Sequence, residues 1–195
     1  MLLLAGLVAG LVIGVVTGGS LGNLANLRFR WPLFVLLVLV IREAGVYGPF
    51  SQVDGVQILY AVSLAALVAW TVWHVKRLPG VWLVALGATL NLLVVLSNGG
   101  RMPVSAELAA RGSHILIDRG FVGQYVLMGP HTNLSWLADW LSVPGPAGAF
   151  LLEAYSPGDL VVAFGIALVA YFGTKRLADP GLVTETSGHI VNDPP

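Results

Sequence analysis

The chain has 195 residues, of which 56% are hydrophobic and only 10% are charged. A soluble domain carries about 25% charged residues, so the composition argues against a soluble protein and favours one helical bundle in lipid. The absence of cysteine excludes disulfides and thiolate metal sites, and the zero net charge without a basic stripe argues against nucleic acid as a partner.

Five apolar segments approach the length of about 20 residues that crosses a bilayer. The predicted fold is therefore all-α: a polytopic membrane bundle of five transmembrane helices (1–177), a structured outer loop (99–155) and a polar cytoplasmic tail (178–195). The first segment lacks the charged start and the cleavage site of a signal peptide, so we expect it to be a retained span. The predicted spans are residues 2–21, 31–47, 56–75, 79–98 and 156–173.

Basic residues are distributed unevenly between the two sides of these spans. Pairs of them follow spans one, three and five, whereas acids outnumber bases on the opposite side. Because lysine and arginine collect on the cytoplasmic side, we predict a bacterial inner-membrane protein with its amino terminus outside and its carboxyl terminus in the cytoplasm. The three pairs are Arg28 and Arg30, Lys76 and Arg77, and Lys175 and Arg176.

Span one carries four glycines at intervals of four: Gly6, Gly10, Gly14 and Gly18. Residues four apart share one face of a helix, and small residues let helices approach closely in lipid. The strip predicts helix packing, within this bundle or, alternatively, against a second copy or a partner subunit.

Polar residues interrupt spans two and four. Arg42 and Glu43 lie near the outer end of span two, where they form either an interfacial charge pair or a polar floor beneath the outer loop. Asn91 lies near the middle of span four, so its amide needs a partner inside the protein. Interhelical hydrogen bonding is the expected role of Asn91, and a ligand contact is the alternative.

Span four ends at a break formed by Asn98, Gly99, Gly100 and Arg101. Gly99 reads as a helix stop that permits positive φ. The backbone amides beside Arg101 offer an anion site, although the carboxyl end of a helix disfavours anions. With Arg42, Glu43 and Asn91, these residues are the candidate ligand-binding set.

The outer segment is too long for a structureless connection. We expect a short helix over 105–111 and a short amphipathic helix over 133–141, whose tryptophans suit a membrane interface. His114 and Asp118 are four residues apart and could act together on a helix, although the apolar residues between them are equally compatible with a strand. His114, Asp118 and Glu107 are the candidate catalytic residues, and no metal site is predicted.

The last span has a clear helix-start pattern. Ser156 is suited to the N-cap, Pro157 to the first turn, and Asp159 follows three residues after the cap.

Three motifs together resemble a family of small bacterial integral membrane proteins that is known only as a domain of unknown function. They are Gly-Gly-Ser-Leu-Gly-Asn-Leu-Ala-Asn at 18–26, Ser-Asn-Gly-Gly-Arg-Met-Pro-Val at 97–104 and Tyr-Ser-Pro-Gly-Asp at 155–159. The resemblance extends to about Leu177 and implies that the outer-face motifs belong together. It implies no activity, ligand or cofactor.

The leading functional hypothesis is a non-catalytic membrane subunit or scaffold that binds a membrane protein partner, a second copy of itself or lipid. The first alternative is an outer-face pocket for a small molecule, lipid or quinone. The second is a membrane-embedded enzyme that uses the histidine and acids of the outer loop.

Overall fold

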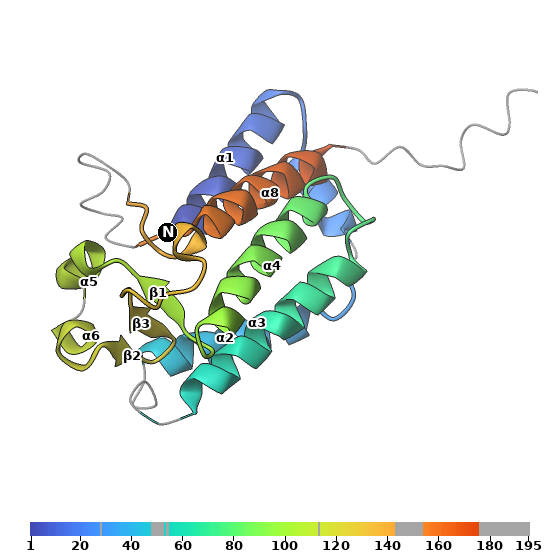
Figure 1. Ribbon diagram of the computed structural model, residues 1–195. Helices are drawn as coiled ribbons and strands as arrows, with labels where there is room; N and C mark the ends of the chain where they lie inside the picture. Colours follow the sequence, from blue (N-terminus) through green and yellow to red (C-terminus); the bar gives the residue numbers. More distant parts are fainter. Residues whose placement is uncertain (28, 48–52, 54, 113, 143–153, 176–195) are drawn as a thin grey trace, which may run out of the picture.

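Figure 1 shows the computed structural model, which describes all residues except 28, 48–52, 54, 113, 143–153 and 176–195. The described part is mostly helical, which confirms the helical class predicted from the sequence. Its longer helices are α1 (Leu2–Val16), α2 (Pro32–Tyr47), α3 (Val56–Trp73), α4 (Val81–Ser97) and α8 (Pro157–Thr174).

The longer helices pack side by side in the order α1, α8, α4, α3 and α2 (Figure 1). The last of these helices in sequence, α8, therefore lies between the first and the fourth of them. Its start has the geometry predicted from the sequence, because Ser156 and Asp159 form a reciprocal capping box around Pro157.

The two ends of this row of helices differ. One end carries the small sheet described below, and we call it the sheet end. We call the opposite end the basic end, because it holds Arg30, Lys76, Arg77 and Lys175. There Lys175 Nζ donates to the Thr17 carbonyl at 2.8 Å, and the Arg30 amide donates to His74 Nε2 at 3.1 Å. The ends of α1, α3 and α8 thus lie on the same side.

Glycines set the spacing between α1 and α8. An added Cβ at Gly6 or Gly10 would collide with backbone atoms of the residue opposite on α8, Ala163 or Ala167. Gly14 lies equally close to the side chain of Thr174. The contacts advance in the same direction along both helices, so α1 and α8 run parallel.

Small residues also bring α4 and α8 together, in antiparallel orientation. A Cβ at Gly87 would lie 2.5 Å from the Gly158 carbonyl oxygen, and one at Gly165 would lie 2.7 Å from the Val84 amide nitrogen. Close backbone approach is the packing mode expected of helices in lipid.

The segment after α4 forms a small sheet within the described residues, so the prediction of an all-α chain is wrong here. The strands β1 (Met102–Val104), β2 (Phe121–Val122) and β3 (Tyr125–Leu127) have the order β1-β3-β2. The β1–β3 pair is parallel and the β2–β3 pair is antiparallel, closed by a turn in which Gly123 has a φ of +53°. Two short helices, α5 (Ala106–Gly112) and α6 (His114–Arg119), connect β1 to β2.

The amphipathic helix predicted over 133–141 is also wrong. Only the 3₁₀ turn η3 (Ser135–Leu137) forms within the described part of that stretch. Leu134 has a φ of +52°, and the Asp139 amide donates to the Pro103 carbonyl at 2.9 Å. The chain therefore leaves helical geometry to run beside β1.

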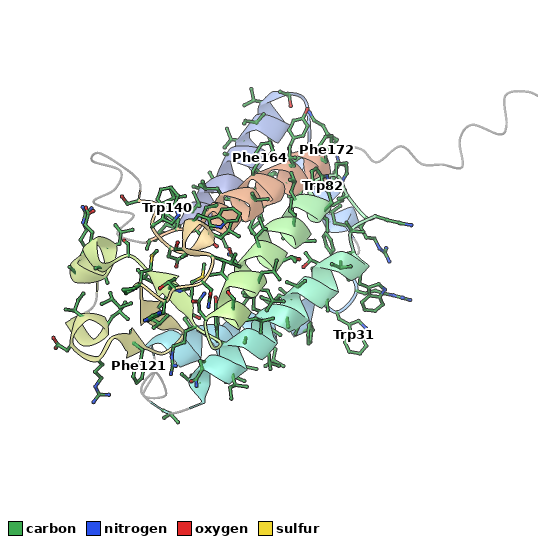
Figure 2. All side chains as sticks on the ribbon, viewed as in Figure 1. Trp31, Trp82, Phe121, Trp140, Phe164 and Phe172 are labelled. Carbon is green, nitrogen blue, oxygen red and sulfur yellow. The ribbon has the colours of Figure 1, made fainter. Side chains whose placement is uncertain are left out.

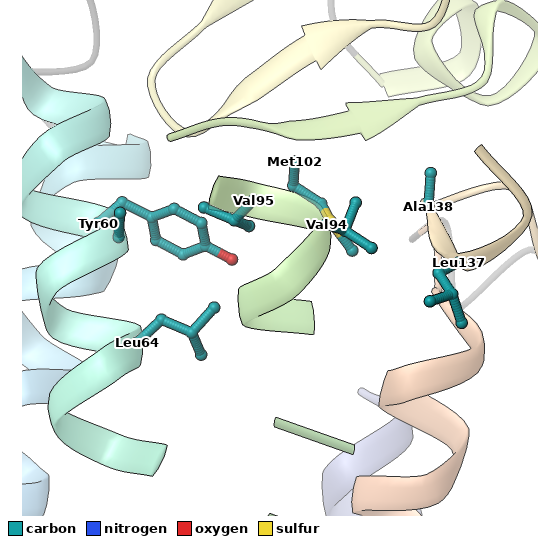
Figure 3. Close-up of a cluster of buried hydrophobic side chains, with 8 residues drawn as sticks. Tyr60, Leu64, Val94, Val95, Met102, Leu137 and Ala138 are labelled. Atoms are coloured by element: carbon teal, nitrogen blue, oxygen red, sulfur yellow. The ribbon is translucent and has the colours of Figure 1, made fainter. Parts of the chain in front are cut away.

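A buried apolar cluster joins the sheet to the bundle, as Figure 3 shows. Tyr60 and Leu64 come from α3, and Val94 and Val95 come from the last turns of α4. Met102 of β1 packs on them, together with Leu137 and Ala138. The sheet is thus part of the same hydrophobic core as the helices.

The helices α1, α2, α3 and α4 are shorter than the predicted spans, whereas α8 has the predicted length and is shifted by one residue. Within the described residues, α3 and α8 have the 18 residues and the apolar composition that could cross a membrane, whereas α1 and α4 are shorter apolar helices. α1 ends at Val16 instead of residue 21, because Gly18 adopts a φ of +87° and the 3₁₀ helix η1 (Leu21–Asn26) follows.

Candidate functional site

The polar residues singled out in the sequence lie at the sheet end, and most of those whose side chains are described form hydrogen bonds within the protein. Asn91 is buried on α4 beside the start of α8. Its Nδ2 donates to Asp159 Oδ1 at 2.7 Å, and its Oδ1 accepts from Ser156 Oγ at 2.8 Å. Asn91 therefore extends the capping box of α8 across to α4, and both ends of its amide are engaged.

Asn98 fixes the loop that precedes η3. Its Nδ2 donates to the Val94 carbonyl at 2.8 Å and to the Asn133 carbonyl at 2.9 Å, while its Oδ1 accepts from the Asn133 amide at 2.9 Å. Asn133 Nδ2 in turn donates to the Ser97 carbonyl at 2.8 Å. This reciprocal pair satisfies carbonyl groups at the end of α4 that have no partner within the helix.

Arg101 connects the sheet to the start of α3. Its Nη2 donates to Gln57 Oε1 at 3.1 Å, and the guanidinium carbon lies 4.6 Å from the centre of the Phe121 ring. The Nε atom is buried and has no hydrogen-bond partner within the described part of the chain. An unpaired buried donor costs about 1–3 kcal/mol, so Arg101 has unused binding capacity.

Gly99 and Gly100 both have positive φ, at +67° and +87°. Nothing lies within 4 Å of a Cβ placed on Gly99, whereas one on Gly100 would lie 3.1 Å from the Gln57 carbonyl oxygen. The Gly100 amide donates to the Val95 carbonyl at 2.9 Å. These glycines turn the chain out of α4, and the Gly100 amide is occupied by that turn.

Arg42 and Glu43 lie in the last turns of α2, but their side chains are outside the described residues. Of the three candidate catalytic residues, the structure describes the side chains of Glu107 and Asp118. Glu107 is exposed and pairs with Arg111 at 2.6 Å on α5, Asp118 is exposed on α6, and the His114 side chain lies outside the described part. No group of metal-binding side chains occurs among the described residues.

In the glycine strip, the first three members face α8, as described above. Gly18 lies beyond the end of α1 and has no atom within 4 Å of an added Cβ. Its role is to end the helix, because φ in the left-handed region favours glycine.

A second polar cluster, at the basic end, was not predicted from the sequence. His74 is 1% exposed, and its Nδ1 lies 2.7 Å from the Trp70 carbonyl while its Nε2 accepts from the Arg30 amide. Trp70 Nε1 donates to the Arg30 carbonyl at 2.8 Å, and Phe29 packs on both rings. These contacts tie the linker before α2 to the end of α3. In the sequence, His74 is only a histidine at the end of an apolar run, and this pattern does not identify Trp70 and Arg30 as its partners.

Around Arg101, sequence reasoning missed Gln57, Phe121 and Gln124. Gln57 lies in the first turn of α3, while Phe121 and Gln124 belong to the β2–β3 hairpin. A glutamine in an apolar stretch is a weak signal, and the pairing of β1 with β3 cannot be read from residue spacing.

Comparison with known proteins places this arrangement in a family. An uncharacterised protein of Thermotoga maritima is 28% identical over 134 residues, which cover 67% of this chain and 73% of that protein. No solved structure matches the chain. Residues 25–171 match the family of unknown function DUF5317, a stretch that contains the motifs at 97–104 and 155–159 and begins near the end of the motif at 18–26. The chain therefore belongs to the family of unknown function DUF5317, in agreement with the resemblance found in its motifs.

Proposed function

We propose that this protein is a five-span protein of a bacterial inner membrane and that it serves as a non-catalytic subunit or scaffold. In this proposal the sheet end faces the outside and the basic end faces the cytoplasm. All five longer helices cross the bilayer, including those with fewer than 18 residues.

The observation that carries the membrane location is the apolar surface of these helices. Large hydrophobic side chains are exposed along each of them, whereas a soluble protein rarely exposes apolar patches of such extent. Lipid tails would cover this surface. Examples are Val8 and Val12 on α1, Leu36 and Val40 on α2, Ile58 and Val62 on α3, Leu93 and Leu96 on α4, and Leu160 and Phe164 on α8.

The exposed tryptophans support the same location. Trp31, Trp73 and Trp82 lie at the basic end, where α2 and α4 begin and α3 ends, and Trp136 and Trp140 lie in the segment at the sheet end. Figure 2 shows Trp31 and Trp82 far from Trp140, with the helices between them. Tryptophan favours both membrane–water interfaces, so this distribution fits a bundle that spans the bilayer.

The scaffold role is supported by the hydrogen bonds that polar groups at the sheet end form within the protein. The Arg101–Gln57 hydrogen bond and the apolar cluster hold the sheet on the helices, and the Asn98–Asn133 hydrogen bonds hold the loop before η3 on the end of α4. Outside this framework, α5 and α6 present an exposed surface of mixed charge that includes Glu107, Arg111 and Asp118. We call it the α5–α6 face, and it is the surface that we assign to a protein partner.

The test is native mass spectrometry of the intact protein, extracted gently from its own membranes. We expect a stoichiometric protein partner, and we expect the double charge reversal Glu107→Lys with Asp118→Lys to abolish its retention. Both carboxylates are exposed, and the Glu107–Arg111 pair is a surface ion pair that contributes about 0–1 kcal/mol, so the fold should persist. The matched control is Lys76→Glu at the basic end, which should retain the partner. A monomer without any protein partner, or equal retention by all three proteins, would contradict the scaffold proposal.

A further inference from the structure

At the sheet end, neither Arg101 Nε nor Gln124 Oε1 has a hydrogen-bond partner within the described part of the chain, although both atoms are buried. Arg101 Nε is a charged donor, and Gln124 Oε1 is a neutral acceptor on a residue that is 3% exposed. Native proteins pair nearly all such groups, and each exception calls for an explanation, such as a bound molecule.

The register of the sheet places these two residues side by side. Met102 of β1 pairs with Tyr125 of β3 in parallel orientation, and the Met102 amide donates to the Gln124 carbonyl at 2.6 Å. Arg101 and Gln124 each precede their strand by one residue, so they occupy adjoining positions. A group that satisfies both must accept a hydrogen bond from a cation and donate one to an amide oxygen.

The side chain of Phe121 packs against Arg101 in this structure. The centre of its ring lies 4.6 Å from the guanidinium carbon of Arg101, and Gln57 Oε1 accepts a hydrogen bond from Nη2 of the same group. Arg101 as a whole is nevertheless partly exposed. Rotation of the Phe121 side chain would expose more of this guanidinium.

The location narrows the class of ligand. Arg101 follows the end of α4, four residues after Ser97, at the level where the proposed span leaves the bilayer. Arginine recognises phosphate through several parallel hydrogen bonds, and phospholipid phosphates lie at this depth.

We infer that Arg101 and Gln124 form a binding site for a phospholipid headgroup that carries both a phosphate and an N–H or O–H donor. The phosphate accepts from Arg101, and the headgroup hydroxyl or ammonium donates to Gln124 Oε1. Phosphatidylglycerol and phosphatidylethanolamine meet both requirements. Phosphatidylcholine has the phosphate, but its quaternary ammonium has no N–H. The inference rests on the membrane location proposed above.

The experiment compares lipid retention in nanodiscs of phosphatidylcholine doped with equal small amounts of phosphatidylglycerol or phosphatidylethanolamine. The full chain is inserted, released gently into the mass spectrometer and examined for bound lipid. We expect wild type to retain either dopant roughly tenfold over phosphatidylcholine, a factor within the range that one hydrogen bond to Gln124 Oε1 supplies. Failure of the protein to insert would instead contradict the proposed membrane location, so the two failures are distinguishable.

Two variants test whether Arg101 and Gln124 are responsible for the retention of phospholipid. Arg101→Gln should lose bound phospholipid of every kind, because the phosphate contact is gone. Gln124→Met should keep phospholipid but lose the preference for donor-bearing headgroups, and its melting temperature in pure phosphatidylcholine should be unchanged or raised, because a buried unpaired acceptor is removed. Arg111→Gln on α5 is the matched control and should behave as wild type.

Other results overturn the inference. Equal retention of all three lipids by wild type would mean that the two buried atoms hold an ordered water only. A lower melting temperature of Gln124→Met in phosphatidylcholine would assign Gln124 a purely structural role. Displacement of the bound lipid by millimolar inorganic phosphate would assign the site to a soluble anion.

Discussion

Asn91 lies among leucines and valines on α4, where its amide cannot exchange hydrogen bonds with water. The side chain is tolerated because Ser156 and Asp159 meet it from α8. Each of the three groups supplies what another lacks: the amide donates to the carboxylate, and the hydroxyl donates to the amide oxygen. The capping box of α8 thus also holds two helices together.

Replacing Asn91 by leucine should lower the free energy of unfolding by about 1–2 kcal/mol, because Asp159 Oδ1 and the Ser156 hydroxyl would lose their partner in a buried place. The measurement is reversible unfolding in mixed micelles. Thr89→Val is the matched control on α4, because the Thr89 hydroxyl donates to the Ala85 carbonyl of its own helix. Equal destabilisation by both variants would argue against a specific role for the contact between α4 and α8.

At this scale, the sequence indicates which residues need a partner but not which partner they find. An asparagine in an apolar run predicts an internal hydrogen bond. Its partners, however, lie 65 and 68 residues away, beyond the reach of any local pattern. The same holds for Arg101, whose neighbours Gln57 and Phe121 come from α3 and from the β2–β3 hairpin.

At the scale of elements, contact between α1 and α8 depends on the absence of side chains. Gly6, Gly10 and Gly14 leave room for the backbone and side chains of α8, and the ammonium of Lys175 donates to the Gly14 and Thr17 carbonyls at 3.3 and 2.8 Å. A cation at the carboxyl end of a helix satisfies carbonyl groups there and interacts favourably with the helix dipole.

Gly10→Val should separate α1 from α8, because the new side chain would overlap the backbone of Ala167. We expect a loss of roughly 1–3 kcal/mol in the free energy of unfolding, the usual cost of overpacking, and faster hydrogen exchange in α1. Ala9→Val is the matched control, since Ala9 is exposed and one position away. If the control is as unstable as Gly10→Val, the close approach of the two helices is not what the glycine provides.

The elements themselves differ in how far they could be predicted. Long apolar runs identify the helices, and Ser156, Pro157 and Asp159 identify the start of α8, because these signals are local. The sheet escapes prediction because β1 has three residues, β2 has two and β3 has three, too few for an alternating pattern. Its pairing joins Met102 to Tyr125 across two intervening helices.

At the scale of the whole molecule, the absence of cysteine makes the proposed orientation directly testable. Ala110 on α5 and Lys76 at the basic end are both exposed. In intact cells, Ala110→Cys should react with a membrane-impermeant maleimide, whereas Lys76→Cys should react only after permeabilisation. The reverse pattern would place the amino terminus inside, and reaction of both without permeabilisation would show that no membrane separates the two ends.

The shortness of α1 has a mechanical consequence if the bundle spans a bilayer as proposed. Its 15 residues rise about 22 Å along the helix axis, against a hydrocarbon thickness of about 30 Å. Lipids beside α1 would have to compress, and bilayer deformation costs a fraction of a kcal/mol for each ångström of mismatch. The free-energy cost of this local thinning is lowered when a second short helix lies in the same thinned region. Bilayer elasticity alone would therefore draw the α1 edge toward thin regions of membrane and toward other proteins that thin the bilayer.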